Sequence, residues 1–345
     1  MGKVTIKDVA RASGVSKGTV DRVLHGREGV SRKSREKILR VIEELGYEPN
    51  VYASLLASGI VRSIAVILPE YTPGEFWGLY ESGIAKAASE AARLNVEVVR
   101  VAYNQYDIDS FRAACREALA KQPAGVVIAP LFQAETALFT AELRSKGIPY
   151  VFVDTKIEED GYLSSYGMPM YRGGYLCADI LSYRRPCEEI LIVRIERDKL
   201  RQSDPTVGRR EGFRDFIREN LPDCTVHNVF IDPKDPEGVA LRLGKFFREH
   251  PGVRHIATFN SRIHLIVPFL EQNGLQDLTV VGFDNLPANL DALRSGVVNA
   301  LITQHPEEQA ARAIQDLTEF IVLKKSPAQR DNFVHMDILT RYNAD

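Results

Sequence analysis

The first 56 residues of the chain carry a helix pattern that strongly restricts the possible folds. Thr5 and Asp8 have the spacing of a capping box at the start of a helix. Gly14 interrupts the apolar periodicity that follows, and Ser16 stands where a second helix would be capped. A four-residue break containing glycine sets two short helices at a steep angle, as in a helix-turn-helix. Ser31 begins a third apolar-periodic stretch, so the sequence predicts a small three-helix unit.

Basic side chains lie between the apolar positions of this unit. They are Lys17, Arg22, Arg27, Arg32, Lys33, Arg35 and Lys37. Residues 1–50 hold 11 Lys and Arg and 7 Asp and Glu, a charge of +4, whereas the whole chain has a formal net charge of −2. The remainder therefore carries −6. A basic module on a mildly acidic body favours nucleic-acid binding at one end of the chain.

The runs TIKDVARASGVSKGTVDRVLHG and VSRKSREKILRVIEELGYEPN resemble the DNA-binding headpiece of the LacI/GalR (lac repressor) family. The family's T-x-x-D-V-A start, G-V-S turn, T-V-x-R-V-L recognition helix and G-Y-x-P-N exit occur here in the family's order and spacing. The resemblance implies a helix-turn-helix headpiece over residues 1–49. The DNA-binding residues that it implies are Thr5, Ser16, Lys17, Gly18, Thr19, Asp21, Arg22, His25, Ser31, Asn50, Ala53 and Leu56.

The recognition helix departs from the family pattern at Lys17, Gly18 and Asp21, where many members carry base-reading side chains or a serine before the arginine. Gly18 has no side chain, and an ionised Asp21 cannot donate to a phosphate. Asp21 could accept from the N4 amino group of cytosine near a guanine read by Arg22. Alternatively, Asp21 pairs with Lys17 or with a neighbour of Arg22 and does not touch DNA. The sequence leaves both interpretations open.

The segment VYASLLASG follows Asn50 and has a poor helical tendency. In addition, so short a helix is marginal in water by itself. It can be an ordinary interdomain linker. The resemblance implies instead a hinge over residues 50–60 that becomes helical on operator DNA. In that interpretation Ala53 and Leu56 take the minor-groove positions, with Leu56 as an apolar wedge.

From Ser63 onward, apolar strands alternate with amphipathic helices. The expected strands fall in two sets, 63–69, 96–102, 125–130 and 149–154, then 190–195, 226–231, 255–260 and 279–284. Continuous Val/Ile-rich strands separated by helices are typical of parallel sheets covered on both faces. The expected fold class is therefore an all-α helix-turn-helix headpiece followed by an α/β core of two Rossmann-like lobes. This core resembles the type I periplasmic-binding-protein-like core of the same family.

The core is expected to cover residues 61–345. We expect lobe 1 over about 61–157 and 303–323, and lobe 2 over about 158–302 and 324–345. Helix 306–322 should return to the first lobe, and the tail from 326 should pass back to the second. Such crossings between lobes can act as a hinge for closure around a ligand.

Polar residues end or follow several of these strands, where ligands of parallel α/β sheets bind. They are Asp154, Asn260, Asp284 and Gln304. Each could also simply cap the next helix. The resemblance matches them to effector-contacting positions and matches Arg209 to the family's binding arginine. Phe76 and Trp77 could supply an aromatic face for a sugar, or could belong to the core of the lobe.

The resemblance implies a ligand-responsive transcription regulator, a repressor that binds a pseudo-palindromic operator DNA as a homodimer. Its effector would be a small sugar-like molecule, and its place the cytoplasm, associated with the nucleoid. The cysteines have no C-x-x-C spacing and the seven His are scattered, so we expect no metal, no cofactor and no catalytic site. No stretch is apolar enough to span a membrane. A transporter's solute-binding protein would share the core but has no use for the headpiece, and no enzyme motif is found.

Overall fold

The computed structural model describes residues 4–24, 26–47, 59–183, 186–195, 206–275 and 277–344. The chain divides into two compact units, Met1–Ile60 and Val61–Asp345. The predicted DNA-contacting residues His25, Asn50, Ala53 and Leu56, and most of the expected hinge, lie outside the described residues. Their roles stay predictions.

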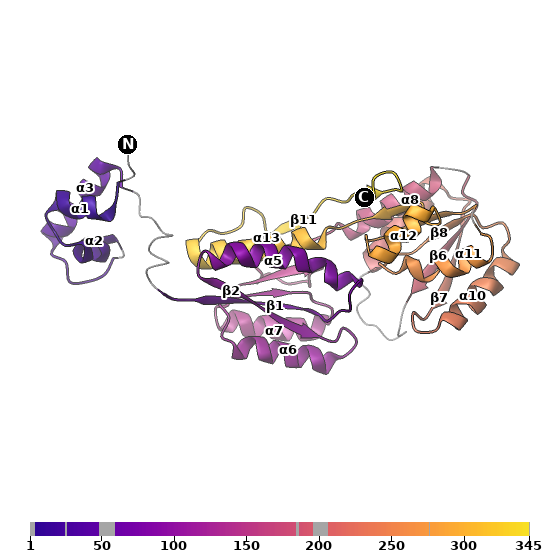
Figure 1. Cartoon of the computed structure of the whole chain (residues 1–345), viewed down its shortest axis with the longest axis horizontal. Helices are drawn as coiled ribbons and strands as arrows, with labels where there is room; N and C mark the ends of the chain where they lie inside the picture. The colour runs from indigo at the N-terminus through magenta and orange to yellow at the C-terminus, as the bar shows by residue number, and fades with distance from the viewer. Residues whose placement is uncertain are drawn as a thin grey trace. The chain divides into compact units, whose positions relative to one another are not determined.

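The headpiece consists of three helices, α1 Ile6–Ser13, α2 Lys17–Leu24 and α3 Arg32–Leu45 (Figure 1). The expected caps hold them. The Thr5 backbone N–H and hydroxyl both donate to the Asp8 carboxylate, at 3.0 and 2.7 Å, and the Ser31 hydroxyl accepts from the Ser34 N–H. Gly14 adopts a left-handed conformation that ends α1, with φ 68°. The buried core of this unit is small: Val9, Ala10, Val20, Val23, Ile38 and Val41.

The first lobe is built on a six-stranded sheet in the order β11-β5-β4-β3-β1-β2. Its strands are β1 Arg62–Pro69, β2 Val96–Tyr103, β3 Gly125–Ile128, β4 Tyr150–Asp154, β5 Ser164–Gly167 and β11 Asp331–Phe333. The helices of this lobe are η1 Phe76–Tyr80, α5 Glu81–Ala92, α6 Ile108–Ala120, α7 Gln133–Ser145 and α13 Pro306–Leu323. In Figure 1, α6 and α7 lie on one face of the sheet and α5 and α13 on the other.

The second lobe has a sheet in the order β12-β10-β9-β8-β6-β7. Its strands are β6 Glu189–Ile195, β7 Thr225–Ile231, β8 His255–Ala257, β9 Thr279–Phe283, β10 Ala300–Ile302 and β12 Ile338–Leu339, with only β12 antiparallel to its neighbour. Its helices are α8 Met170–Ser182, α9 Val207–Asn220, α10 Pro236–Glu249, η2 Ile263–Leu265, α11 Val267–Gln272 and α12 Pro287–Ser295. Two apolar cores, one on each face of the sheet, hold these layers together. The predicted fold class is confirmed.

The expected lobe boundaries need two corrections. Strand β5 pairs with β4, and β11 pairs with β5, so residues to about 167 and residues 331–333 belong to the first sheet rather than the second lobe. The sequences SSYG and DNF lack the apolar runs that mark a buried strand, so they read as loop. The chain therefore passes between the lobes after β5, after β10 and after β11.

Because α5 packs closely against the start of α13, a substitution at Gly83 is expected to change the stability of the fold. A Cβ atom added at Gly83 would overlap the backbone carbonyl of Glu307, whereas one added at Gly244 in α10 would meet only ordinary contacts, the nearest at 3.5 Å. Overpacking against backbone costs about 1–3 kcal/mol, while Gly→Ala in an unobstructed helix gains up to ~1 kcal/mol.

We expect Gly83→Ala to lower the urea midpoint of the full chain and Gly244→Ala to leave it unchanged or raise it. Equal effects of the two substitutions would contradict the tight α5–α13 contact.

Candidate functional site in the cleft of the core

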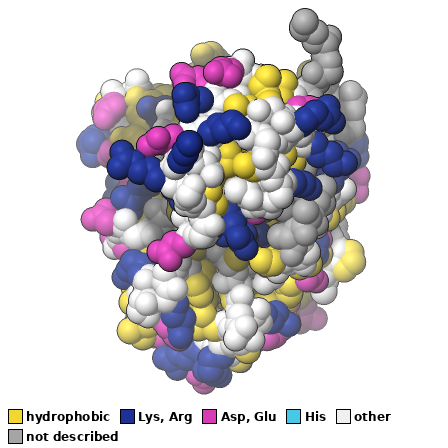
Figure 2. All heavy atoms as spheres, turned by 90° about the vertical axis from the view of Figure 1, so that its left-hand side faces the viewer, with side chains coloured by type: hydrophobic (Ala, Val, Ile, Leu, Met, Phe, Trp, Pro, Cys, Tyr) yellow, Lys and Arg dark blue, Asp and Glu magenta, His cyan; other side chains and the backbone are white. Residues whose placement is uncertain are grey.

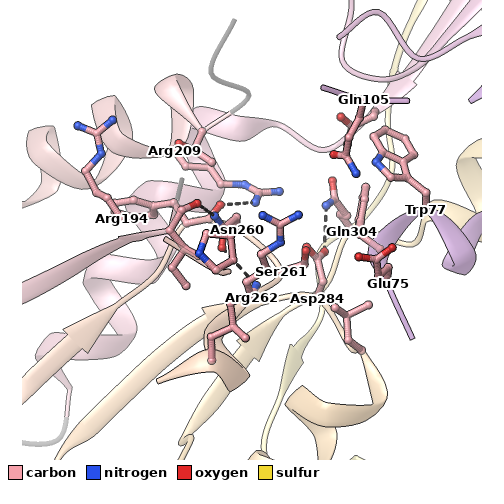
Figure 3. Close-up of a pocket in the computed structure, with 18 of the residues that line it drawn as sticks. Glu75, Trp77, Gln105, Arg194, Arg209, Asn260, Ser261, Arg262, Asp284 and Gln304 are labelled. Atoms are coloured by element: carbon pink, nitrogen blue, oxygen red, sulfur yellow. Dashed lines mark hydrogen bonds between the residues drawn. The ribbon is translucent and has the colours of Figure 1, made fainter. Parts of the chain in front are cut away.

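A cavity of about 570 Å³ lies between the two lobes of the core (Figure 3). Both lobes line it, largely with residues at or beyond the carboxyl ends of their strands, where ligands of parallel sheets bind. The seven residues that the sequence indicated for an effector all line this cavity: Phe76, Trp77, Asp154, Arg209, Asn260, Asp284 and Gln304.

Asp154 and Asp284 occupy equivalent places in the two lobes. Each follows or ends the strand that stands third in its sheet order, β4 and β9. Both have φ 69°, a left-handed conformation that Asp tolerates better than most residues. They are only 6% and 2% exposed, so two carboxyl groups are buried at one cavity.

Burial dominates the electrostatics of this pair. Loss of hydration raises the pKa of Asp154 to about 7, with the Arg209 charge opposing and the Asp284 charge adding to the shift. The pKa of Asp284 is raised by burial as well, against the lowering effects of Arg209 and of a hydrogen bond from Gln304. Near neutral pH, both protonation states of Asp154 are therefore populated, so its carboxyl group can donate or accept a hydrogen bond.

Arg209 is the cation that faces both carboxyl groups. It lies in the first turn of α9 and is 4% exposed. Its Nη1 donates to the Phe259 carbonyl at 2.7 Å, its Nη2 contacts the Met168 Sδ at 2.7 Å, and its guanidinium lies 4.1 Å from the Phe283 ring centre. Burial lowers its pKa, and the two aspartates raise it. The buried Nε has no hydrogen-bond partner among the described residues.

Gln304 and Gln309 connect the cavity to the crossing after β10. Gln304 Nε2 donates to Asp284 at 2.9 Å, while its buried Oε1 has no partner among the described residues. Behind it, the fully buried Gln309 of α13 donates to the Gln304 carbonyl and accepts from the Asp154 N–H, at 2.8 and 2.9 Å. Gln309 also accepts from the Tyr80 hydroxyl at 3.1 Å. One side chain thereby fixes the backbone at two cavity residues.

The remaining predicted residues are held by their neighbours. Asn260 Nδ2 donates to the Ile195 carbonyl at 2.9 Å, which orients its amide at the end of β8. Trp77 is 6% exposed and stacks on Tyr80 with ring centres 5.4 Å apart, and Phe76 meets Trp77 edge to face at 5.1 Å. The two interpretations of these rings are therefore compatible, since they pack in the first lobe and also line the cavity.

The structure adds polar lining residues that the sequence did not indicate. They are Glu75, Gln105, Tyr106, Arg194, Thr206, Arg210, Ser261, Arg262 and His264. Arg262 of the second lobe donates to the Tyr106 hydroxyl of the first at 2.7 Å and so joins the lobes across the cavity. Tyr106 lies just beyond β2 and Arg262 just beyond β8, so the rule applied to Asp154 could have found them.

Asn289 supports one wall of the cavity from behind. It is fully buried in α12, its Nδ2 donates to the carbonyls of Ser261 and Asp284 at 2.9 and 3.0 Å, and its Oδ1 lies 2.8 Å from the His264 Nδ1. The carboxamide oxygen accepts, so His264 carries its proton on Nδ1. Burial lowers the pKa of His264, which favours the neutral ring. An Asn within a helix gives no sequence signal of this role.

The headpiece presents the predicted DNA-reading residues on its surface. Ser16, Lys17, Gly18 and Arg22 are exposed along α2, whereas Val20 and Val23 on its other side are buried. Figure 2 shows one face of the molecule, with Lys and Arg side chains spread over it and Asp and Glu interspersed.

Asp21 pairs with Arg27, at 3.4 Å between carboxylate and guanidinium. The ion-pair alternative for Asp21 thus has a partner close by, while its role toward DNA stays a prediction. The Ser16 and Thr19 hydroxyls lie 2.9 Å apart, and the Thr19 N–H donates to the Ser16 hydroxyl.

The described helices include none that is long and apolar enough to cross a membrane.

Comparison with known proteins gives one result for each unit. Residues 5–50 match the model of the bacterial regulatory proteins of the lacI family, and residues 64–325 match the periplasmic binding protein domain. The HTH-type transcriptional regulator RegA of Clostridium saccharobutylicum is 25% identical over 303 residues, covering 83% of this chain and 84% of RegA.

Two solved structures are also similar to the core of this chain. A LacI transcriptional regulator from Bacteroides fragilis is 31% identical with a TM-score of 0.76, over 82% of this chain and 98% of its own. GanP, a glucose-galactose binding protein from Geobacillus stearothermophilus, is 22% identical with a TM-score of 0.68, over 82% and 99% of the two chains. GanP shows the fold of the core alone.

The buried Asp154 predicts a specific pH dependence of stability. Because its pKa rises from 3.8 to about 7 on folding, the folded state keeps a proton that the unfolded state releases between about pH 4 and pH 7. The contribution of this group to the free energy of unfolding is full at low pH and is lost as pH rises through 7.

Asp154→Asn removes this titration, so its urea midpoint relative to wild type should increase from pH 5 to pH 8. The exposed Asp109→Asn serves as the control. A wild-type-minus-variant difference that is constant over this range would show that Asp154 is not a buried acid with a raised pKa.

Proposed function

Because the chain belongs to the LacI family of DNA-binding transcriptional regulators, we propose that it is a ligand-responsive repressor that binds a pseudo-palindromic operator as a dimer. Its effector is a small sugar or sugar derivative held in the cleft of the core. As a transcription regulator, the protein would act in the cytoplasm, where it meets its operator DNA. The relatives are named as regulators, which sets the enzyme alternative aside.

The observation that carries the sugar assignment is the set of planar polar groups around one cavity. The carboxyls of Asp154 and Asp284, the guanidinium of Arg209 and the amides of Asn260 and Gln304 can each engage two neighbouring hydroxyls. Among the described residues, Arg209 Nε has no acceptor and Gln304 Oε1 has no donor, and a hydroxyl can serve as either.

The aromatic pair Phe76–Trp77 provides apolar surface beside these groups for the C–H face of a sugar ring. GanP, which shares the fold of the core, is itself named as a sugar-binding protein. A cavity of about 570 Å³ is large enough for a monosaccharide or a slightly larger ligand.

Regulation follows from the arrangement of the two lobes. Closure around an effector would change the crossings after β5, β10 and β11, and Gln304 and Gln309 lie in the crossing after β10 or just beyond it. A two-fold dimer requires a two-fold site, with one recognition helix per half-site. Effector binding would change how the two headpieces meet the operator, which couples the cleft to DNA binding.

A thermal-shift screen of the full chain with D-glucose, D-galactose, D-arabinose and polyols tests the effector assignment, because a bound ligand stabilises the folded state. Some sugars are expected to raise the thermal midpoint of the wild type. Asp284→Asn should weaken the binding of these sugars by about 1.5–3 kcal/mol, which is the cost of losing a charged hydrogen bond. Glu97→Gln, an exposed change on β2, is the matched control.

Operator affinity without effector should be the same for wild type, Asp284→Asn and Glu97→Gln. Calorimetric affinity of Asp284→Asn equal to that of the wild type would place the effector elsewhere. If no sugar or polyol shifts the wild type, the sugar-like effector is wrong, although the family assignment stands.

The exposed Arg22 carries the prediction for DNA. Operators selected by the wild type from a randomised pool should contain two inverted half-sites. Arg22→Ala should cost about 1–3 kcal/mol on that operator and relax the preference for one guanine per half-site. Lys37→Ala, on α3, should weaken binding to the operator and to random duplex alike if Lys37 contacts only phosphate. Equal losses on both duplexes for Arg22→Ala would refute its role as a base reader.

A further inference from the structure

A cluster of potential metal ligands lies in the second lobe, away from the cleft. Glu189 is the first residue of β6, His227 lies near the start of β7, and His250 caps the C-terminal end of α10. The cleft is lined by residues at the other end of β6, Val193 to Ile195. The two sites are therefore at opposite ends of the same sheet.

The sheet register explains why these side chains meet. Strands β6 and β7 are parallel, with Glu189 beside Thr225 and Leu191 beside His227. Alternate residues of a strand face the same side, so Glu189, Leu191 and His227 share one face. Leu191 packs in the same apolar core as Phe246 of α10, so this is the face that α10 covers. The end of α10 then brings His250 to the same place.

The three donor atoms already lie close to the spacing of a metal site. Glu189 Oε2 lies 3.0 Å from His227 Nε2 and 3.7 Å from His250 Nδ1, and all three atoms are within 4.8 Å of one another. Zinc bonds to nitrogen and oxygen of about 2.0–2.2 Å place tetrahedral ligand atoms roughly 3.3–3.6 Å apart. Small side-chain adjustments would bring these atoms to that spacing.

The surroundings also favour a cation. The imidazole rings of His227 and His250 have centres 4.2 Å apart, and the Phe246 ring packs against both, at 5.4 and 4.7 Å. The three ligand side chains are 19–35% exposed, so they are partly shielded yet open to solvent. The carboxyl end of the 14-residue helix α10 carries partial negative charge, which attracts a cation.

We propose that Glu189, His227 and His250 bind a divalent transition metal ion of the Zn²⁺ class, with water at the fourth position. Two imidazoles and one carboxylate suit such ions and not Mg²⁺ or Ca²⁺, which prefer oxygen ligands. The ion joins β6, β7 and α10, so it stabilises the folded second lobe. This site is independent of the effector proposed for the cleft.

A second cluster, His305, Glu308 and His335, also brings three donor atoms within 4.8 Å. It lies at the amino end of α13, where the helix dipole opposes a cation. Glu308 is paired with Arg312, and the His335 side chain is 62% exposed. These features make it the weaker site, and His335→Gln therefore provides a matched control.

The test uses the full chain without an affinity tag, dialysed against a chelator. Zn²⁺ should raise its thermal midpoint, and titration with Co²⁺ should give one equivalent per chain with the visible absorption of a low-coordinate nitrogen and oxygen site. Mg²⁺ should do neither. His227→Gln and His250→Gln should weaken Co²⁺ binding at least ~100-fold, since losing even an outer partner of a ligand costs ~10–100-fold.

Without metal, circular dichroism should show both variants folded, and His335→Gln should bind Co²⁺ like the wild type. The proposal is overturned if Zn²⁺ leaves the wild-type midpoint unchanged, or if His227→Gln and His250→Gln keep wild-type affinity. It is overturned equally if His335→Gln abolishes the bound equivalent, because the ion then sits at α13. Glu189→Gln, which keeps the side-chain shape, should lower affinity without unfolding the lobe.

Discussion

The cleft depends on the charge interaction of the Arg209 guanidinium with Asp154 and Asp284. Two carboxyl groups, Asp154 and Asp284, are buried at one cavity, and burial alone makes a pair of carboxylates there very unfavourable. Arg209 offsets part of their charge and is itself held by the Phe259 carbonyl and the Phe283 ring. Incomplete compensation leaves the site ready for a ligand that brings hydrogen bonds of its own, and an ordinary apolar pocket lacks that property.

Gln309 links the cavity residues to a segment that crosses between the two lobes. Its amide bonds to the backbone of Asp154, at the end of β4, and of Gln304, in the crossing after β10. Because it is fully buried and also accepts from Tyr80, it has little freedom to move independently of either segment. A ligand that shifts Asp284 or Gln304 therefore acts on a crossing between the lobes through a short chain of hydrogen bonds.

The sequence predicted the architecture because its strongest signals are physical requirements of the fold. Val/Ile-rich strands such as 63–69 must be buried on both faces, and a polar residue at their end, such as Asp154, must face a cleft or cap a helix. Strand β5, with the sequence SSYG, has no apolar run and was placed in the wrong lobe. Gln309 reads as a surface helix residue, and Glu189, His227 and His250 are too far apart in sequence to suggest one site. The register of β6 and β7 brings Glu189 and His227 together, and the end of α10 adds His250.

The two units differ in how substitutions act on them. In α2, Arg22 is exposed while Val20 and Val23 hold the helix to a core of a few side chains, so the exposed face of α2 can change without disturbing the fold. In the cleft each functional side chain also positions another, as Gln304 does for Asp284 and Asn289 for Ser261. A cleft substitution that changes shape therefore alters stability and binding together. For this reason the exposed face of α2 can change more freely in this chain than the lining of the cleft.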